Sequence, residues 1–335
     1  MTRLQRILSG LLVVQVALVA AVFWPRTAVN AAGAALFPDL KPEDVVRFLV
    51  EDSDGNQIEL ARQGDGWVLA SADDYPADAS RIDPLLEKIV GIKTNRLVAQ
   101  TEASHKRLKV ADDAFESRVQ LVLDDGSTRT FFLGSSPNIH SVHIRRAGLD
   151  ETYLTSDIKG RKISAQVHNW IDTLYISVPR DEVTAMTLEN GSGTFALTKD
   201  ADGNWSLAGM SEEEEIAISR VNTLLSRIGT MRLAKPLGKE MKPEYGLDNP
   251  QAKLSVFTSG ENGDKTYTLL VGVQDPDDHS YVVKWSDSPY YVRVAGFYGD
   301  DITLTTRDDL IQQLPTPTPI SEDTGTPTPT PTPEA

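Results

Sequence analysis

The stretch Arg81–Ile92, RIDPLLEKIVGI, decides the fold because the chain contains a second version of it. Arg220–Met231, RVNTLLSRIGTM, lies 139 positions further along the chain. Both stretches carry apolar residues at the same five places: Ile82, Leu85, Leu86, Ile89 and Ile92, then Val221, Leu224, Leu225, Ile228 and Met231. This spacing predicts an amphipathic α-helix with one apolar face. Because an isolated helix of this length is marginal in water, we expect a β-sheet to cover that face.

The residues around the two stretches repeat as well. A strand with a tryptophan precedes each predicted helix, at 66–70 (GWVLA) and 204–208 (NWSLA). Later strands end in Gly134 and in Gly272, and His140-Ser141 recurs as His279-Ser280. We therefore predict an α+β protein with two tandem related domains, 36–157 and 181–310, joined by a bridge over 158–180. Each domain is expected to be an antiparallel sheet with one principal helix.

The N-terminus has the pattern of a membrane anchor. Residues 1–6 contain Arg3 and Arg6, and residues 7–24 are almost entirely apolar. As a helix, the second segment would span roughly 27 Å, close to the thickness of one hydrocarbon core. Positive residues stay on the cytoplasmic side, so we expect a single-pass protein whose bulk is extracytoplasmic. A cleaved signal peptide is the alternative, with Ala32-Gly33-Ala34 as its cleavage site. Residues 315–335 are a Thr/Pro-rich tail, a composition that cannot build a core.

Composition excludes several classes of function. The formal net charge is -15, which disfavours binding to nucleic acid and to anionic lipid headgroups. The chain contains no cysteine, which rules out disulfides, thiol catalysis and zinc sites built on cysteine. The chain also lacks a nucleophile elbow, a P-loop and a dinucleotide glycine pattern.

Two motifs invite a metal, and each has a simpler explanation. His140 and His143 are three residues apart, so on a strand their side chains point to opposite faces. The segments 52–56 and 200–204 place aspartates around a glycine, but their spacing does not match an EF-hand loop and suits a hairpin turn. We predict no catalytic residue, no cofactor and no metal ligand. Acidic residues are numerous, but their number alone does not indicate a hydrolase.

Aromatic side chains supply the interface candidates: Trp170, Tyr175, Trp285, Tyr290 and Tyr291. Large rigid aromatics contribute strongly to binding when they are partly exposed. Trp67 and Trp205 recur beside each helix, which favours a place in the core instead.

The motif series resembles a bacterial family catalogued as domain of unknown function 4340. The resemblance rests on GWVLA, YPADASRIDPLLEKI, ASHKRLKVADDAF, TFFLG, VHIRRAG and ETYL in the first half, and on EYGLDNPQAKL and YTLLVG in the second. It covers nearly all of residues 36–309, and the chain departs from it at Leu108-Lys109-Val110. The resemblance implies an anchored envelope protein, in some members associated with ABC-type export systems.

These observations lead to one expectation and two alternatives. We expect a non-enzymatic, membrane-anchored accessory or scaffold protein whose partners are envelope or ABC-type transporter proteins. The first alternative is an extracytoplasmic binding module for a glycan, a peptide or a divalent cation. The second is an envelope hydrolase, which requires an acidic pair inside a concave pocket.

Overall fold

The computed structural model describes residues 33–260 and 263–313, which form two compact units divided between Asp172 and Thr173. The predicted cytoplasmic segment and anchor (1–24) and the predicted tail (315–335) lie outside the described residues. In the part of the chain that is described, no helix is long and apolar enough to cross a membrane. The predicted bridge, 158–180, is shared between the units, because the division falls within it.

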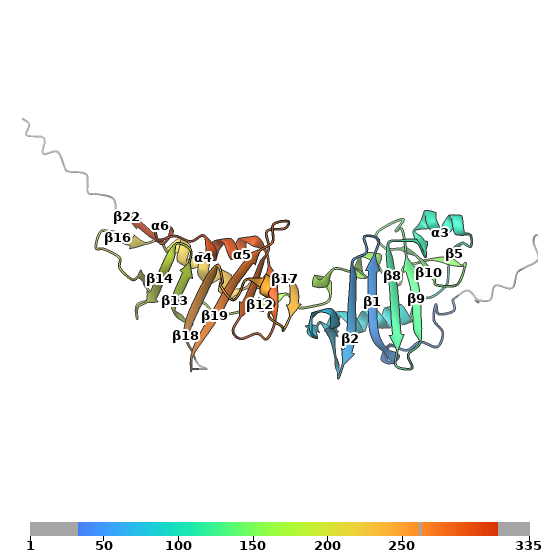
Figure 1. Ribbon diagram of the computed structural model, residues 1–335. Coiled ribbons are helices and arrows are strands. Elements are labelled where there is room, and N and C mark those ends of the chain that lie inside the picture. The colour runs from blue at the N-terminus through green and yellow to red at the C-terminus, as the bar shows by residue number, and fades with distance from the viewer. Residues whose placement is uncertain (1–32, 261–262, 314–335) are drawn as a thin grey trace, which may run out of the picture. The chain divides into compact units, whose positions relative to one another are not determined.

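Within residues 33–172, nine antiparallel strands form one sheet (Figure 1). Their order across the sheet is β4 (Tyr75–Ala77), β3 (Gly66–Leu69), β2 (Gln57–Gln63), β1 (Val45–Asp52), β8 (Ser117–Leu123), β9 (Thr128–Leu133), β10 (Val142–Arg146), β11 (Thr152–Thr155) and β5 (Leu97–Ala99). A small separate hairpin joins β6 (Val110–Ala111) to β7 (Ala114–Phe115). Apolar side chains on alternate positions of β8 are buried, as expected for a sheet with one covered face.

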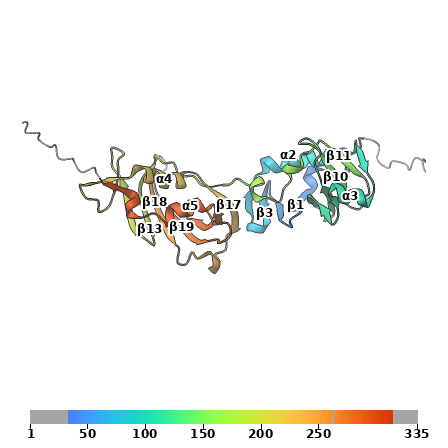
Figure 2. The same cartoon turned by 90° about the horizontal axis from the view of Figure 1, so that it is seen from above.

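The helix predicted from Arg81–Ile92 is α2, Ala79–Val90, and it lies across one face of this sheet (Figure 2). Asp78 is the N-cap, and its side chain accepts a hydrogen bond from the Ser80 backbone N–H. The helix runs through Pro84, although an interior proline removes one backbone hydrogen bond. Burial of Ile82, Leu86 and Ile89 against the sheet offsets that loss.

Within residues 173–313, a second sheet also has nine antiparallel strands among the described residues. Their order is β12 (Leu174–Ile176), β17 (Met231–Gly238), β21 (Tyr291–Val294), β20 (Tyr281–Trp285), β19 (Gly263–Gln274), β18 (Ala252–Gly260), β13 (Val183–Asn190), β14 (Gly193–Lys199) and β15 (Trp205–Leu207). A short hairpin pairs β16 (Glu214–Ile216) with β22 (Ile311–Gln313).

Eight strands of one sheet correspond in order to eight strands of the other. The correspondence starts at β5 in the first unit and at β17 in the second. It continues through two hairpins to the central strand and ends at the tryptophan strand, beyond which, among the described residues, only the first sheet has a further strand, β4. The pairing of β1 with β8 is irregular between Val45 and Arg47, and the pairing of β13 with β18 is irregular between Val183 and Ala185. The two irregularities are separated by the same interval of sequence as the other matched features.

The helices on the second sheet are α4 (Ile218–Gly229) and α5 (Gly296–Thr303), which pack against each other and against the sheet (Figure 2). Val221, Leu225 and Ile228 of α4 are buried, as the sequence pattern predicts. Two short helices, α3 (Glu102–Leu108) and α6 (Arg307–Leu310), and five 3-10 turns complete the described residues. Trp67 and Trp205 are buried, which confirms that both belong to the core of their units.

Candidate functional site

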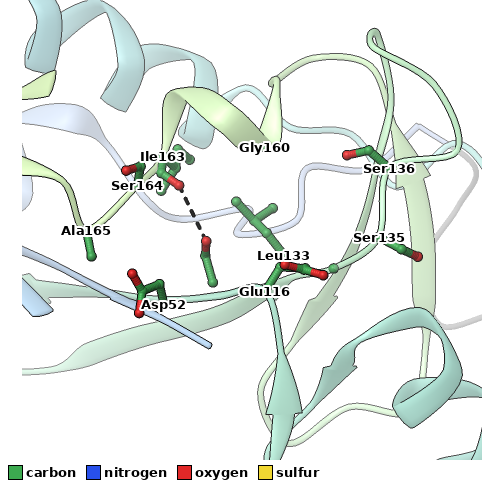
Figure 3. Close-up of a pocket in the computed structure, with 11 residues that line it drawn as sticks. Asp52, Glu116, Leu133, Ser135, Ser136, Gly160, Ile163, Ser164 and Ala165 are labelled. Carbon is green, nitrogen blue, oxygen red and sulfur yellow. Dashed lines mark hydrogen bonds between the residues drawn. The ribbon is translucent and has the colours of Figure 1, made fainter. Parts of the chain in front are cut away.

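A polar hollow of about 360 Å³ opens in the first unit, at the ends of its central strands (Figure 3). Its carboxylates are Asp52, the last residue of β1, and Glu116, which precedes β8. Four serines also line this space: Ser117, Ser135, Ser136 and Ser164. The 3-10 turn over Gly160–Lys162 closes one side. The lining is mixed, and it suits a polar ligand better than an apolar one.

Asp52 is held in place by its own hairpin turn. Its Oδ1 accepts hydrogen bonds from the backbone N–H groups of Asp54 at 3.0 Å and Asn56 at 2.9 Å. Burial acts to raise the pKa of the Asp52 carboxyl, but the hydrogen bonds from Asn56, Asp54 and Gly55 outweigh it and lower the pKa below its ordinary value. Asp52 is therefore a fixed, ionised acceptor and is not suited to act as a general acid.

Glu116 is neutralised by a cation from outside the hollow. Lys109 Nζ donates a hydrogen bond to Glu116 Oε1. The backbone of Glu116 is anchored as well, because its N–H donates to the Leu133 carbonyl at 3.1 Å. The lowered pKa of Asp52 is the opposite of what a catalytic acid requires at neutral pH.

A serine and a histidine meet beside the hollow, but their geometry is structural. His143 Nδ1 lies 2.7 Å from the Ser135 carbonyl oxygen and 3.1 Å from Ser135 Oγ. Since the carbonyl can only accept, Nδ1 carries the proton and donates to it. The Ser135 hydroxyl points to the Leu108 carbonyl at 3.2 Å. Nδ1 therefore cannot accept the serine proton, and the pair is not arranged for nucleophilic catalysis.

The position of Ser135 depends on the glycine before it. A Cβ on Gly134 would lie 2.1 Å from the Leu108 carbonyl oxygen, so only glycine lets β9 approach the end of α3 this closely. Gly272 is in the corresponding place of the second unit, where a Cβ would lie 2.0 Å from the Tyr245 carbonyl oxygen. The two glycines recur in the sequence because each unit contains the same close approach of two backbone segments.

The motifs that invited a metal are turns and strand ends. His140 is exposed in the turn before β10, whereas His143 makes the contacts with Ser135 described above. Asp200 Oδ1 accepts hydrogen bonds from the backbone N–H groups of Asp202 and Asn204, just as Asp52 does in its own turn. Among the described residues, no group of three or more His, Asp or Glu side chains is arranged to hold a metal ion.

The five interface candidates fall into two groups by exposure. Trp170 is 1% exposed and lies edge-on to Phe48 in the first unit, with its indole N–H donating to the Ser164 carbonyl. Trp285 and Tyr290 are buried in the second unit, whereas Tyr175 and Tyr291 are half-buried. The exposure that their interface role requires is thus found only at Tyr175 and Tyr291, and that role remains a prediction.

Three of these candidates form one hydrogen-bonded cluster. The Tyr175 hydroxyl donates to the Tyr290 carbonyl at 2.7 Å and accepts from the Trp285 backbone N–H at 2.9 Å. Burial raises the pKa of Tyr175 to about 12, although the hydrogen bond from Trp285 acts in the opposite direction. The hydroxyl therefore stays protonated and attaches β12 to the rest of the second sheet.

Sequence reasoning did not identify the polar hollow. Its residues come from β1, the β7–β8 connection, the end of β9 and the segment after β11, and they form no short motif. The sequence signals near it were Gly134 and the segment 52–56, which contains Asp52.

Comparison with known proteins identifies the family and nothing beyond it. No curated protein and no solved structure is significantly similar to the chain. The family model described as "Domain of unknown function (DUF4340)" matches residues 67–250, from the tryptophan strand of the first unit into the second. Because that match covers more than half of the 335 residues, the chain belongs to the DUF4340 family.

Proposed function

We propose that this protein is a non-enzymatic accessory or scaffold protein, anchored in the cell membrane by residues 7–24, whose two units face outward and bind partner proteins. The observation that carries the proposal is the pair of sheets with matching strand order, each with its own buried core and its own covering helix. Repetition of a whole sheet multiplies binding surface without creating a reaction centre. The carboxylates and the serine–histidine pair of the polar hollow are engaged in structural contacts, which is consistent with binding rather than catalysis.

We further propose that the two units are tandem copies of one domain. Three features separated by a nearly constant interval of sequence support a duplication. These are the helix positions, the pairing irregularities at Val45 and Val183, and the close backbone crossings at Gly134 and Gly272. Independent origins would not be expected to reproduce both the strand order and these local details.

The anchor is supported by sequence alone. Arg3 and Arg6 precede a long apolar segment, and the positive-inside rule then places everything after Trp24 outside the cytoplasm. Fusion of alkaline phosphatase and of green fluorescent protein to the C-terminus tests this topology. We expect an active phosphatase fusion and a dark fluorescent fusion, and the opposite result would contradict the proposal.

The scaffold role is tested by capture from cross-linked, solubilised membranes of the native host. We expect the full-length protein to retain envelope proteins, among them components of an ABC-type transporter. A matched bait that keeps residues 1–32 and replaces the rest with an unrelated soluble domain controls for capture by the anchor. Recovery of the same proteins with both baits would contradict a role for the two units.

A second candidate function follows from the polar hollow, whose ionised Asp52 and serine hydroxyls could bind a glycan or a peptide backbone. A specific ligand raises apparent stability by mass action, so thermal shift with cell-wall fragments and with calcium is the first test. Ser136→Val, which removes a hydroxyl from the lining, should abolish any shift caused by a hollow-bound ligand. An equal shift in this variant would place the ligand elsewhere.

A further inference from the structure

A second hollow in the first unit is lined by cations, although the chain as a whole is acidic. Its volume is about 430 Å³. One wall is the exposed edge of α2, where Arg81, Pro84, Leu85 and Lys88 follow each other at helical spacing. The opposite wall is the segment after β11, which contributes Lys159 and Lys162. We call this the lysine hollow.

The three lysines of the lysine hollow make no ion pair with any described residue. Lys88, Lys159 and Lys162 are all exposed, and the described part of the chain brings no carboxylate within salt-bridge distance of them. The one carboxylate in the lining, Asp157, does not pair with these lysines. Its Oδ2 accepts a hydrogen bond from the Lys93 backbone N–H at 3.0 Å. The lining therefore carries a net positive charge, because four cationic residues share it with one carboxylate.

Arg81 gives the hollow a rigid edge. Its Nη1 donates to the carbonyl oxygens of His168 at 3.2 Å and Ile171 at 3.3 Å, and its Nε pairs with Asp78 at 2.9 Å. These contacts fasten the segment after β11 to α2, so the two walls are held at a fixed separation. Preorganised walls lower the entropic cost of binding a ligand.

The corresponding place in the second unit, between α4 and the segment that follows β21, is filled by a carboxylate. Arg220 and Arg227 of α4 occupy the positions that Arg81 and Lys88 occupy in α2. Both arginines bind Asp301, with Arg220 Nη1 at 3.0 Å from Oδ1 and Arg227 Nε at 2.6 Å from Oδ2. Asp301 belongs to α5, which follows the last strand of its sheet just as the second wall of the lysine hollow follows β11.

We propose that the lysine hollow binds a carboxylate of an acidic peptide segment, and that Lys88 takes toward it the role that Arg227 takes toward Asp301. The second unit pairs Arg227 with its own aspartate, whereas the first unit leaves Lys88 to an external carboxylate. Three lysines around one space favour a segment with several acidic residues. A second copy of the chain is a poor source, because chains with a net charge of -15 repel one another. The inference rests on the proposed function, since the segment would belong to a partner protein.

The test uses the purified full-length protein in nonionic detergent and a fluorescein-labelled tetraglutamate peptide, with the tetraglutamine peptide as the neutral control. Fluorescence anisotropy should report binding of the glutamate peptide only. A partly exposed ion pair contributes modestly, so Lys88→Ala should weaken binding about twofold to fivefold. The triple variant Lys88→Ala, Lys159→Ala, Lys162→Ala should weaken it roughly tenfold or more, on the same basis. Lys265→Ala, an exposed lysine of β19 in the second unit, should leave binding unchanged.

Lys88→Arg is the control for an effect of substitution on folding. It restores the residue type found at the corresponding position of α4, so it should bind as tightly as the wild type. Equal binding of both peptides, or unchanged binding in the triple variant, would overturn the proposal. Displacement of the peptide by an equal concentration of inorganic phosphate would overturn the assignment to carboxylates.

The capture experiment separates this inference from the proposed function. If the triple variant still captures membrane partners while peptide binding is absent, the scaffold role stands and the lysine hollow is not its docking site. If the peptide binds as expected but no membrane partner is captured, the carboxylate site stands and the proposed scaffold role fails.

Discussion

At the scale of single residues, Gly134 and Gly272 each allow a strand to pack closely against the backbone of a neighbouring segment. A Cβ at Gly272 would lie 2.0 Å from a backbone oxygen, which cannot move aside as a flexible side chain could. We expect Gly272→Ala to destabilise the second unit by about 1–3 kcal/mol, the usual cost of overpacking. Urea denaturation followed by circular dichroism measures this loss. Gly191→Ala is the matched control, because a Cβ there meets nothing within 4 Å, and an equal loss in both variants would refute the steric argument.

One ion pair at the same scale makes stability depend on pH. The hydrogen bonds from the Arg307 guanidinium to Glu214, at 2.8 Å and 2.7 Å, lower the pKa of the Glu214 carboxyl from its ordinary 4.5 to about 2. A carboxyl with a depressed pKa stabilises the fold above its ordinary pKa, and this contribution disappears as the pH falls from about 4.5 to 2. Glu214→Gln should therefore show a shallower loss of Tm over that window than the wild type. Parallel Tm curves would show that the pair does not contribute.

At the scale of elements, Asp301 joins two helices. It binds Arg220 and Arg227 of α4 from its position in α5, and its side chain is 20% exposed. Asp301→Asn leaves two partly buried guanidinium groups without their anion, and we expect it to cost about 1–3 kcal/mol of unfolding free energy. The exposed Asp287→Asn is the control and should change stability little. Chemical denaturation at neutral pH compares the two variants, and equal stability would mean that the ion pairs of Asp301 do not stabilise the fold.

At the scale of the whole molecule, each unit has its own core, so each should respond to its own core mutations. Leu86 is 1% exposed in the first unit and Leu225 is 5% exposed in the second. Replacement of either by alanine should cost about 2–5 kcal/mol, through lost burial and the cavity left behind. Differential scanning calorimetry should show that Leu86→Ala lowers one thermal transition and Leu225→Ala lowers another. A single transition shifted equally by both variants would contradict independent units.

Local patterns predicted the principal helices α2 and α4, but not α5, which is a second helix on the sheet of the second unit. The positions of Ile82, Leu86 and Ile89 predicted the buried face of α2. The turns at 52–56 and 200–204 followed from the conformational preferences of glycine, asparagine and aspartate. The passage of α2 through Pro84 depends on tertiary burial, which no local pattern reports. The aromatic candidates were chosen by residue type, and residue type does not report burial.

The sequence by itself therefore determined the family, the class of fold and the phase of each amphipathic helix, because these depend on periodicities of a few residues and on recurring motifs. Only the tertiary structure decided which aromatic side chains are buried, which carboxylates are engaged, and where the lysine hollow lies. Lys88 and Lys159 are 71 positions apart, and nothing local marks them as neighbours. Their proximity arises because α2 crosses one face of the sheet and the chain returns over it after β11, a consequence of strand order that no short stretch encodes.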